Sequence, residues 1–347
     1  MKVKTLLLFL FFSASYAQNP AEAEKLVEEG IELHDKGDYP GAIAKYGKAL
    51  EVDKNNLMAL SEKALTLSAS GQYDEAIKAC KQIISTHSNE DLSNVYVSYA
   101  NSLDHLKKTD EALSIYEEGI QKFPNYYQLY FNKGICYANT NKPHEAIGCF
   151  QKALLVNPNH PGSLNAIAIM EAESNRIPSI LAFSRFLILE PQTPRAEKNL
   201  GSLKNLLMQG VKQEDKGITI NINSDVVSDS KNKKKENDFS QADLILSMAA
   251  ALDFDEKNLN KTDVEKFIGK FETICASLDE TKKGNSGFYW ENLTPYFIEM
   301  NKKKMIKPFG YIAFAASGNE DVSKWLQENQ AELEKFYTWS TEYNWKK

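Results

Sequence analysis

A small residue returns at a nearly constant interval along the first half of this 347-residue chain. It stands at Ala42, Ala76, Ala112 and Ala146, and the larger Ile180 holds the next equivalent position. The intervals are 34, 36, 34 and 34 residues. A fixed period near 34 residues is typical of a solenoid of helix pairs, in which each pair buries its apolar face only by stacking on its neighbours. The period therefore predicts a surface that binds a partner, and it does not by itself predict a catalytic site.

The same frame holds at other positions when the repeats are set at 23–56, 57–90, 93–126, 127–160 and 161–194. The eighth position is small in every repeat: Gly30, Ala64, Ala100, Gly134 and Ala168. The twenty-fourth position is mostly bulky: Tyr46, Cys80, Tyr116, Phe150 and Ser184. The turn inside each pair carries residues that tolerate a left-handed backbone, with Lys107 as the exception: Gly37, Gly71, Asn141 and Asn175.

Segments such as Gly37-Asp38-Tyr39-Pro40-Gly41-Ala42-Ile43 resemble the tetratricopeptide repeat (TPR) family, and the resemblance covers about half of the chain. Repeats one to four match well, whereas the fifth departs, with Ile180 and Ser184 at its two most characteristic positions. Residues 195–208 form one more amphipathic helix, as the end of a solenoid needs. The resemblance implies an all-α fold, with a TPR α-solenoid of four to five helix pairs and a capping helix over 23–208.

The period stops after Met208. We interpret 209–238 as a linker with one brief strand near Ile218–Ile222 and a solvated lysine cluster at 231–235. Residues 239–347 then predict a separate helical C-terminal domain, with helical segments at 240–252, 262–277, 290–314 with a break at Pro308, and 321–343. Thr262 and Glu265 have the spacing of a capping box at the start of the second segment.

The N-terminus predicts a signal peptide over 1–17, because Lys2 and Lys4 precede the apolar run 6–12 and Ala17 suits a cleavage site. The run is too short to span a membrane, and no later segment is apolar enough to do so. We therefore expect an exported protein, periplasmic or secreted. Cleavage leaves 39 basic and 47 acidic residues, a balance that makes nucleic acid an unfavourable partner.

The sequence contains no pattern that predicts an enzyme, a cofactor site or a metal site. All five histidines lie before residue 161, which excludes a Ser-His-Asp or Cys-His site inside the C-terminal region. The four cysteines, Cys80, Cys136, Cys149 and Cys275, lack metal-binding spacing. We interpret them as small buried hydrophobic residues, with a disulfide between Cys136 and Cys149 as the alternative.

The resemblance to TPR proteins implies that the second, fifth, ninth and twelfth positions of each first helix face a concave groove. The predicted groove residues are Val27, Ile31, His34, Met58, Leu65, Val97, Asn101, Asp104, Gln128, Phe131 and Ile135, and Glu24 holds the second position of the first repeat. We expect this groove to accept an extended or helical segment of a protein or peptide partner, anchored by Phe131 and oriented by Asn101. The alternative is that several of these residues pack inside the solenoid or against the C-terminal domain.

One subtype of TPR groove holds a C-terminal carboxylate between two asparagines and flanking cations. Asn101 and Asn132 have about the right separation, but Val97, Gly162 and Ala166 stand where the cations belong. A carboxylate would find no compensating charge, so the sequence argues against that subtype.

A different function is suggested by the aromatic residues of the C-terminal region, which holds all four tryptophans: Trp290, Trp325, Trp339 and Trp345. If exposed, they suit a glycan or cell-wall binding module, or less favourably a glycan-active enzyme with Glu291 and Glu299 as paired carboxylates. Packing in a hydrophobic core is the ordinary alternative for such residues. The whole chain also resembles exported repeat proteins of Bacteroidetes-type bacteria that carry an uncharacterised helical C-terminal region, a likeness that supplies no activity.

Overall fold

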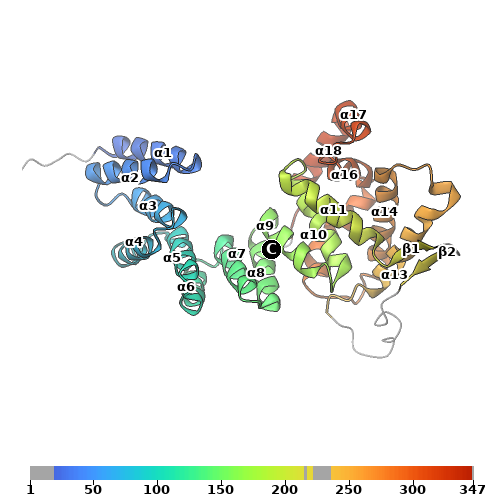
Figure 1. Ribbon diagram of the computed structural model, residues 1–347, viewed down its shortest axis with the longest axis horizontal. Helices are drawn as coiled ribbons and strands as arrows, with labels where there is room; N and C mark the ends of the chain where they lie inside the picture. Colours follow the sequence, from blue (N-terminus) through green and yellow to red (C-terminus); the bar gives the residue numbers. More distant parts are fainter. Residues whose placement is uncertain (1–18, 215–216, 222–235, 346–347) are drawn as a thin grey trace, which may run out of the picture. The chain divides into compact units, whose positions relative to one another are not determined.

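The computed structural model describes residues 19–214, 217–221 and 236–345, so the predicted signal peptide and the lysine cluster lie outside the described residues. The chain divides into two compact units, residues 1–132 and 133–347 (Figure 1). Figure 1 labels the helices of the first unit, which are α1 Pro20–Asp35, α2 Tyr39–Val52, α3 Leu57–Ala69, α4 Tyr73–Thr86, α5 Ser93–His105 and α6 Thr109–Lys122. Helix α7, Tyr127–Asn139, is divided between the two units.

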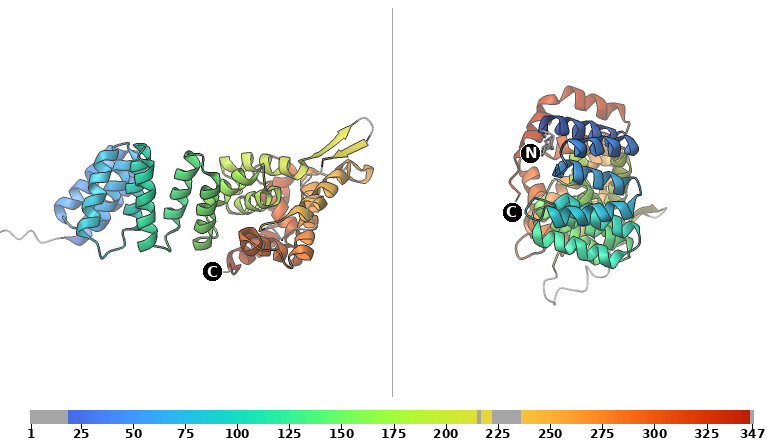
Figure 2. Two further views of the ribbon diagram at one scale, coloured as in Figure 1. Left: turned by 90° about the horizontal axis from the view of Figure 1, so that it is seen from below. Right: turned by 90° about the vertical axis from the view of Figure 1, so that its left-hand side faces the viewer.

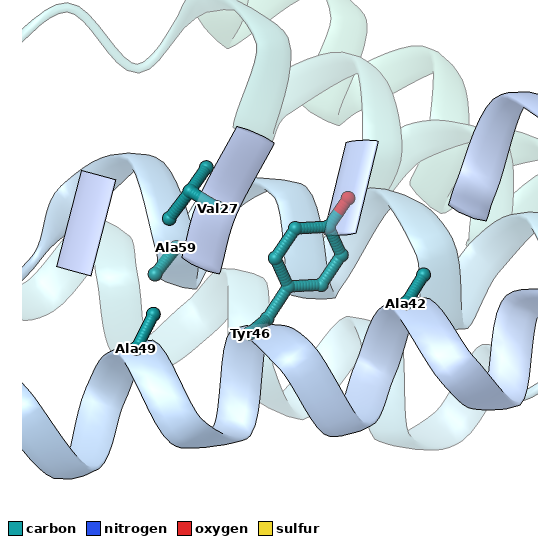
Figure 3. Packing of buried hydrophobic residues seen from close by; sticks show 5 residues of the cluster. All are labelled: Val27, Ala42, Tyr46, Ala49 and Ala59. Atoms are coloured by element: carbon teal, nitrogen blue, oxygen red, sulfur yellow. The ribbon is translucent and has the colours of Figure 1, made fainter. Parts of the chain in front are cut away.

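The first unit is built as the period predicts, from helix pairs that stack in chain order. Val27, Ala42, Tyr46, Ala49 and Ala59 form one buried cluster that joins α1, α2 and α3 (Figure 3). The small eighth position has a direct steric reason, because a Cβ added at Gly30 would lie 2.4 Å from Cε1 of Tyr46. The Gly134 and Phe150 pair in the second unit repeats this relation, with a separation of 2.6 Å.

The turns inside the first four pairs use the left-handed backbone conformation. Gly37, Gly71, Lys107 and Asn141 have φ values of 80°, 81°, 64° and 57°, so even the exceptional lysine adopts it. The prediction is wrong for Asn175, whose φ is −137°. This residue instead occupies the N-cap position of α10 without a side-chain capping bond, and its side-chain amide donates a hydrogen bond to Glu171 of α9.

The second unit continues with α8 Pro143–Val156, α9 Pro161–Glu171, α10 Arg176–Leu189 and α11 Pro194–Met208. Strands β1 Val211–Glu214 and β2 Gly217–Ile220 form an antiparallel hairpin with Val211 opposite Ile220 (Figure 2). The predicted linker thus contains two strands instead of one, and both contact α13, Ser240–Ala251.

The remaining elements are the short helices η1 Leu252–Phe254, η2 Glu256–Asn258 and η3 Tyr289–Leu293, and the helices α14 Asp263–Thr281, α15 Thr294–Lys302, α16 Ile306–Ala313, α17 Glu320–Glu328 and α18 Gln330–Glu342. The capping box of Thr262 and Glu265 is confirmed. The predicted break at Pro308 is wrong: α15 ends before Lys304, which has a φ of 59°, and Pro308 lies in the first turn of α16. A proline is tolerated there because the N–H groups of a first turn have no partner inside the helix.

Helices α10 and α11 contact α13, α14 and α16, so the last repeat and the C-terminal helices share one compact unit (Figure 1). This division differs from the predicted one, in which the linker 209–238 separates the solenoid from the C-terminal domain. The physical reason lies in α10, where every residue from Ile177 to Ile188 is buried. A helix that is apolar on all sides needs neighbours on all sides.

Candidate functional site

The first helices of neighbouring pairs lie side by side in the first unit. Helix α3 contacts both α1 and α5, whereas within residues 19–132 the second helices α2, α4 and α6 contact one another far less. The stack therefore bends toward the first helices, and their exposed side forms its inner surface.

Two hydrogen bonds link these first helices at equivalent positions. Nδ1 of His34 lies 2.7 Å from Oγ1 of Thr66, and the Ser102 hydroxyl donates to Oγ of Ser68 at 2.9 Å. Each bond joins first helices of neighbouring repeats near their C-terminal ends. His34 is therefore a packing residue as well as a predicted groove residue.

The predicted apolar groove residues do not all reach the surface. Val27 is only 1% exposed and packs in the core of Figure 3 against Tyr46, so the expectation that it lines the groove is wrong. Ile31 packs partly against the same cluster. Leu65 and Val97 are half-buried, and Met58 is 52% exposed. These last three residues retain apolar surface on α3 and α5.

Unlike His34, the predicted groove residues Asn101 and Asp104 are half-buried and make hydrogen bonds within their own repeat. Asn101 accepts a hydrogen bond from the hydroxyl of Tyr116, and Asp104 accepts one from Thr109 at 3.2 Å. Nδ2 of Asn132 donates to the carbonyl oxygen of Gln128 at 2.9 Å. Both asparagines of the rejected carboxylate-binding pattern are thus engaged by the protein itself.

Helix α7 contributes the last predicted residues. Gln128 and Phe131 are half-buried in the part of α7 that belongs to the first unit, and Ile135 is 37% exposed in the second unit. We call the accessible predicted residues of the first unit the first-helix surface: Ile31, Met58, Leu65, Val97, Asn101, Asp104, Gln128 and Phe131.

Glu62 adds a carboxylate to α3 that the sequence analysis missed. It is half-buried, and burial raises the pKa of its side chain, an effect that nearby His34 opposes. The available signal was its position in α3, which carries only one other charged residue, Lys63.

A buried arginine, Arg185, holds the second unit together and was also missed. Its side chain is 1% exposed, and Nη1 donates to the Tyr296 hydroxyl and the Ser340 hydroxyl, each at 2.9 Å. Nη2 donates to Oδ1 of Asn159 at 2.6 Å, and the guanidinium lies over the rings of Tyr296 and Trp345 at 4.5 and 5.1 Å. Burial lowers the pKa of Arg185, but an arginine stays charged in proteins. The signal was a lone cation in the middle of an apolar helix.

Three more hydrogen bonds connect the last repeat with the C-terminal helices. The hydroxyl of Tyr289 donates to Oε1 of Glu171 at 2.6 Å, and both residues are buried. Nη1 of Arg176 donates to Oδ1 of Asp243 at 3.1 Å and to Oγ of Ser247 at 2.9 Å. The C-terminal helices therefore recognise this repeat by specific hydrogen bonds as well as by burial.

The aromatic residues of the C-terminal region mostly pack in its core or against the last repeat. Trp290 is 6% exposed, stacks on Phe239 with ring centres 4.3 Å apart, and donates from its indole to the carbonyl of Asp238. Trp339 stacks on Tyr296 and donates to Glu299. Trp339 also lines an open hollow of about 650 Å³ together with Lys303, Met305, Ala331, Glu334, Lys335, Thr338 and Glu342.

Other chemical sites are not apparent in the described part of the chain. It contains no group of three or more His, Cys, Asp or Glu side chains arranged to hold a metal ion, and no helix long and apolar enough to cross a membrane. All four cysteines are buried, and burial raises the pKa of Cys80 to about 12. A thiol with so high a pKa is a poor nucleophile.

Residues 33–96 and 127–160 match the tetratricopeptide repeat family, so the chain contains TPR repeats. The small glutamine-rich tetratricopeptide repeat-containing protein 2 of Mycosarcoma maydis is 31% identical over 105 residues, which cover 30% of this chain and 29% of that protein. The probable UDP-N-acetylglucosamine–peptide N-acetylglucosaminyltransferase SPINDLY of Arabidopsis thaliana is 32% identical over 84 residues, 24% of this chain and 9% of that protein. The chain thus spans less than a third of the length of these relatives. A thermophilic TPR protein of Thermus thermophilus has a solved structure with a TM-score of 0.46 at 18% identity, covering 52% of this chain and 98% of that one.

Proposed function

We propose that this protein is an interaction scaffold that holds a segment of a protein partner on the first-helix surface. The observation that carries the proposal is the apolar surface of Met58, Leu65 and Val97 on the inner side of the stack. Apolar side chains flanked by polar ones are the ordinary means of binding a peptide segment. TPR domains generally mediate contacts between proteins, which supports the same function.

The position of the C-terminal helices agrees with an accessible inner side in the second unit. They pack on α10 and α11, whereas Ile169 of α9 stays 53% exposed. Ile169 occupies the ninth position of the fifth repeat, the position of Ile31 and Leu65 in earlier repeats. The C-terminal helices thus cover the second helix of this pair and leave this first-helix position open.

The test is capture of partners by the full chain and by variants from the cell envelope. Met58→Asp and Leu65→Asp should both lose the captured proteins, because a carboxylate replaces the apolar contact. The matched control is Leu155→Asp, which changes an apolar residue of α8 that is 48% exposed and lies outside the surface. Capture that is equal for all variants, each checked for an unchanged melting temperature, contradicts the proposal.

Glycan binding is the second candidate, and the hollow beside Trp339 is the place that favours it. A volume of about 650 Å³ lies within the range of small-ligand sites. A glycan array probed with the full chain tests this candidate. Binding that is lost in Trp339→Ala and kept in Trp325→Ala supports a sugar site there.

We also propose export, on the pattern of residues 1–17. N-terminal sequencing of the protein from a fractionated cell should begin at Gln18. A cytoplasmic protein that retains Met1–Ala17 contradicts export without affecting the binding proposal.

A further inference from the structure

The two units differ sharply in charge. Residues 19–132 hold 19 acidic and 11 basic side chains, whereas residues 133–347 hold 28 of each. After removal of the predicted signal peptide, the entire acidic excess of the chain therefore lies in the first unit. Such an asymmetry acts on the choice and the association rate of partners rather than on the fold.

Within the first unit, the excess is concentrated on the first helices. Together α1, α3 and α5 carry eight acidic residues and only two basic ones, Lys25 and Lys63. Helices α2, α4 and α6 carry seven acidic and five basic residues. Two of the α1 carboxylates are paired, Glu29 with Lys45 and Glu32 with Lys36. The inner side is thus more acidic than the outer side of the same stack.

Glu24 and Asp104, the carboxylates among the predicted groove positions, give the first-helix surface its negative charge. Glu24, at the second position of the first repeat, is exposed and Asp104 is half-buried, and none of the predicted groove residues is a lysine or an arginine. Glu62 of α3 is half-buried near His34, and burial raises the pKa of its side chain. A cation placed beside these carboxylates would gain attraction that water screens poorly at a half-buried site.

We propose that the first-helix surface selects a basic amphipathic segment, with apolar side chains on Met58, Leu65 and Val97 and lysine or arginine beside Glu24, Glu62 and Asp104. The inference rests on the proposed function, because the apolar residues define the surface and the carboxylates select what binds there. An acidic segment is repelled, and repulsion of the wrong charge is a common source of specificity.

A peptide-display selection on the immobilised full chain tests this inference without a known partner. The probe is a library of random dodecapeptides, selected in parallel on the unchanged protein and on Met58→Asn/Leu65→Asn, which removes the apolar surface without changing its charge. Peptides that depend on the surface should be enriched in Lys and Arg over Asp and Glu relative to the unselected library. Surface-dependent peptides that are neutral or acidic would overturn the inference while leaving the proposed function intact. Absence of any surface-dependent peptide counts against both.

Charge variants then measure the effect on the best selected peptide by fluorescence anisotropy. Glu24→Gln/Asp104→Asn should weaken binding about threefold to tenfold, and the loss should shrink at high salt. The matched control is Asp74→Asn/Glu75→Gln, which removes two exposed carboxylates from α4 on the outer side. Equal effects of the two pairs would show that only net charge matters and would overturn the assignment of Glu24 and Asp104.

Discussion

Helices α4 and α10 hold the same place in two repeats, and the contrast between them separates the two units. In α4 the buried residues are Ala76, Ile77, Cys80 and Ile83, a single stripe, whereas α10 is buried continuously from Ile177 to Ile188. Position twenty-six of the frame makes the difference plain. It is exposed as Lys48, Gln82, Glu118 and Lys152 in the first four repeats and fully buried as Phe186 in the fifth. A repeat helix thus loses its amphipathic pattern where a further domain packs on its outer face.

The largest expected effect tests that contrast directly. Phe186→Ala should lower the free energy of unfolding by about 3–5 kcal/mol, because it opens a cavity between α10 and its neighbours. Lys152→Ala, the exposed equivalent one repeat earlier, should change it by less than about 0.5 kcal/mol. Denaturant unfolding measures both. A loss below about 1 kcal/mol for Phe186→Ala would mean that α10 is not enclosed.

A polar contact between the last repeat and the C-terminal helices should have a smaller effect. Tyr289→Phe removes the hydrogen bond to buried Glu171 and should destabilise the protein by about 1–3 kcal/mol, since it weakens the solvation of a buried carboxylate. Tyr337→Phe is the control, because that ring is 39% exposed. Equal melting temperatures for the two variants would show that the contact between the last repeat and the C-terminal helices depends on apolar burial alone.

In the first unit, Glu62 predicts that the stability of the protein depends on pH. Its folded-state pKa lies above the unfolded value, so the folded state favours the protonated form and loses stability as pH rises through the folded pKa. Glu62→Gln should therefore stabilise the protein at about pH 7, by no more than about 1 kcal/mol, and the gain should vanish below the unfolded pKa. Chemical denaturation across pH, with Glu51→Gln as an exposed control, measures this. A gain that persists in acid contradicts it.

The smallest effect belongs to an exposed ion pair between α11 and α14. Nζ of Lys204 donates to Oδ2 of Asp263 at 2.5 Å, and this bond lowers the pKa of Asp263. The contribution is present above the unfolded pKa and is lost as pH falls through the folded pKa. Because the two side chains are 45% and 67% exposed, Lys204→Met should cost at most about 0.5 kcal/mol, and less in high salt. A cost above about 2 kcal/mol would contradict a weak, solvent-screened ion pair.

The sequence predicted the repeats because their spacing is a local and repeated requirement. Gly30 and Gly134 are small since Tyr46 and Phe150 fill the adjoining space, and the same relation appears in both of these pairs. The candidate surface was less predictable. Val27 and Leu65 were both predicted to face the groove, yet Val27 is buried in the core and Leu65 is not, because burial depends on which neighbours each helix has.

Spacing and side-chain size alone therefore determined the all-helical repeat and most of its turns, because both follow from contacts within about one period. Tertiary structure alone decided that Arg185 lies among Tyr296, Ser340 and Asn159, residues between 26 and 155 positions away. It also supplied the reason why the fifth repeat departs from the pattern, since α10 packs against the C-terminal helices. Contacts between residues so far apart produce no period in a sequence. The sequence shows only that each contacting residue is apolar or charged, and not which residue it contacts.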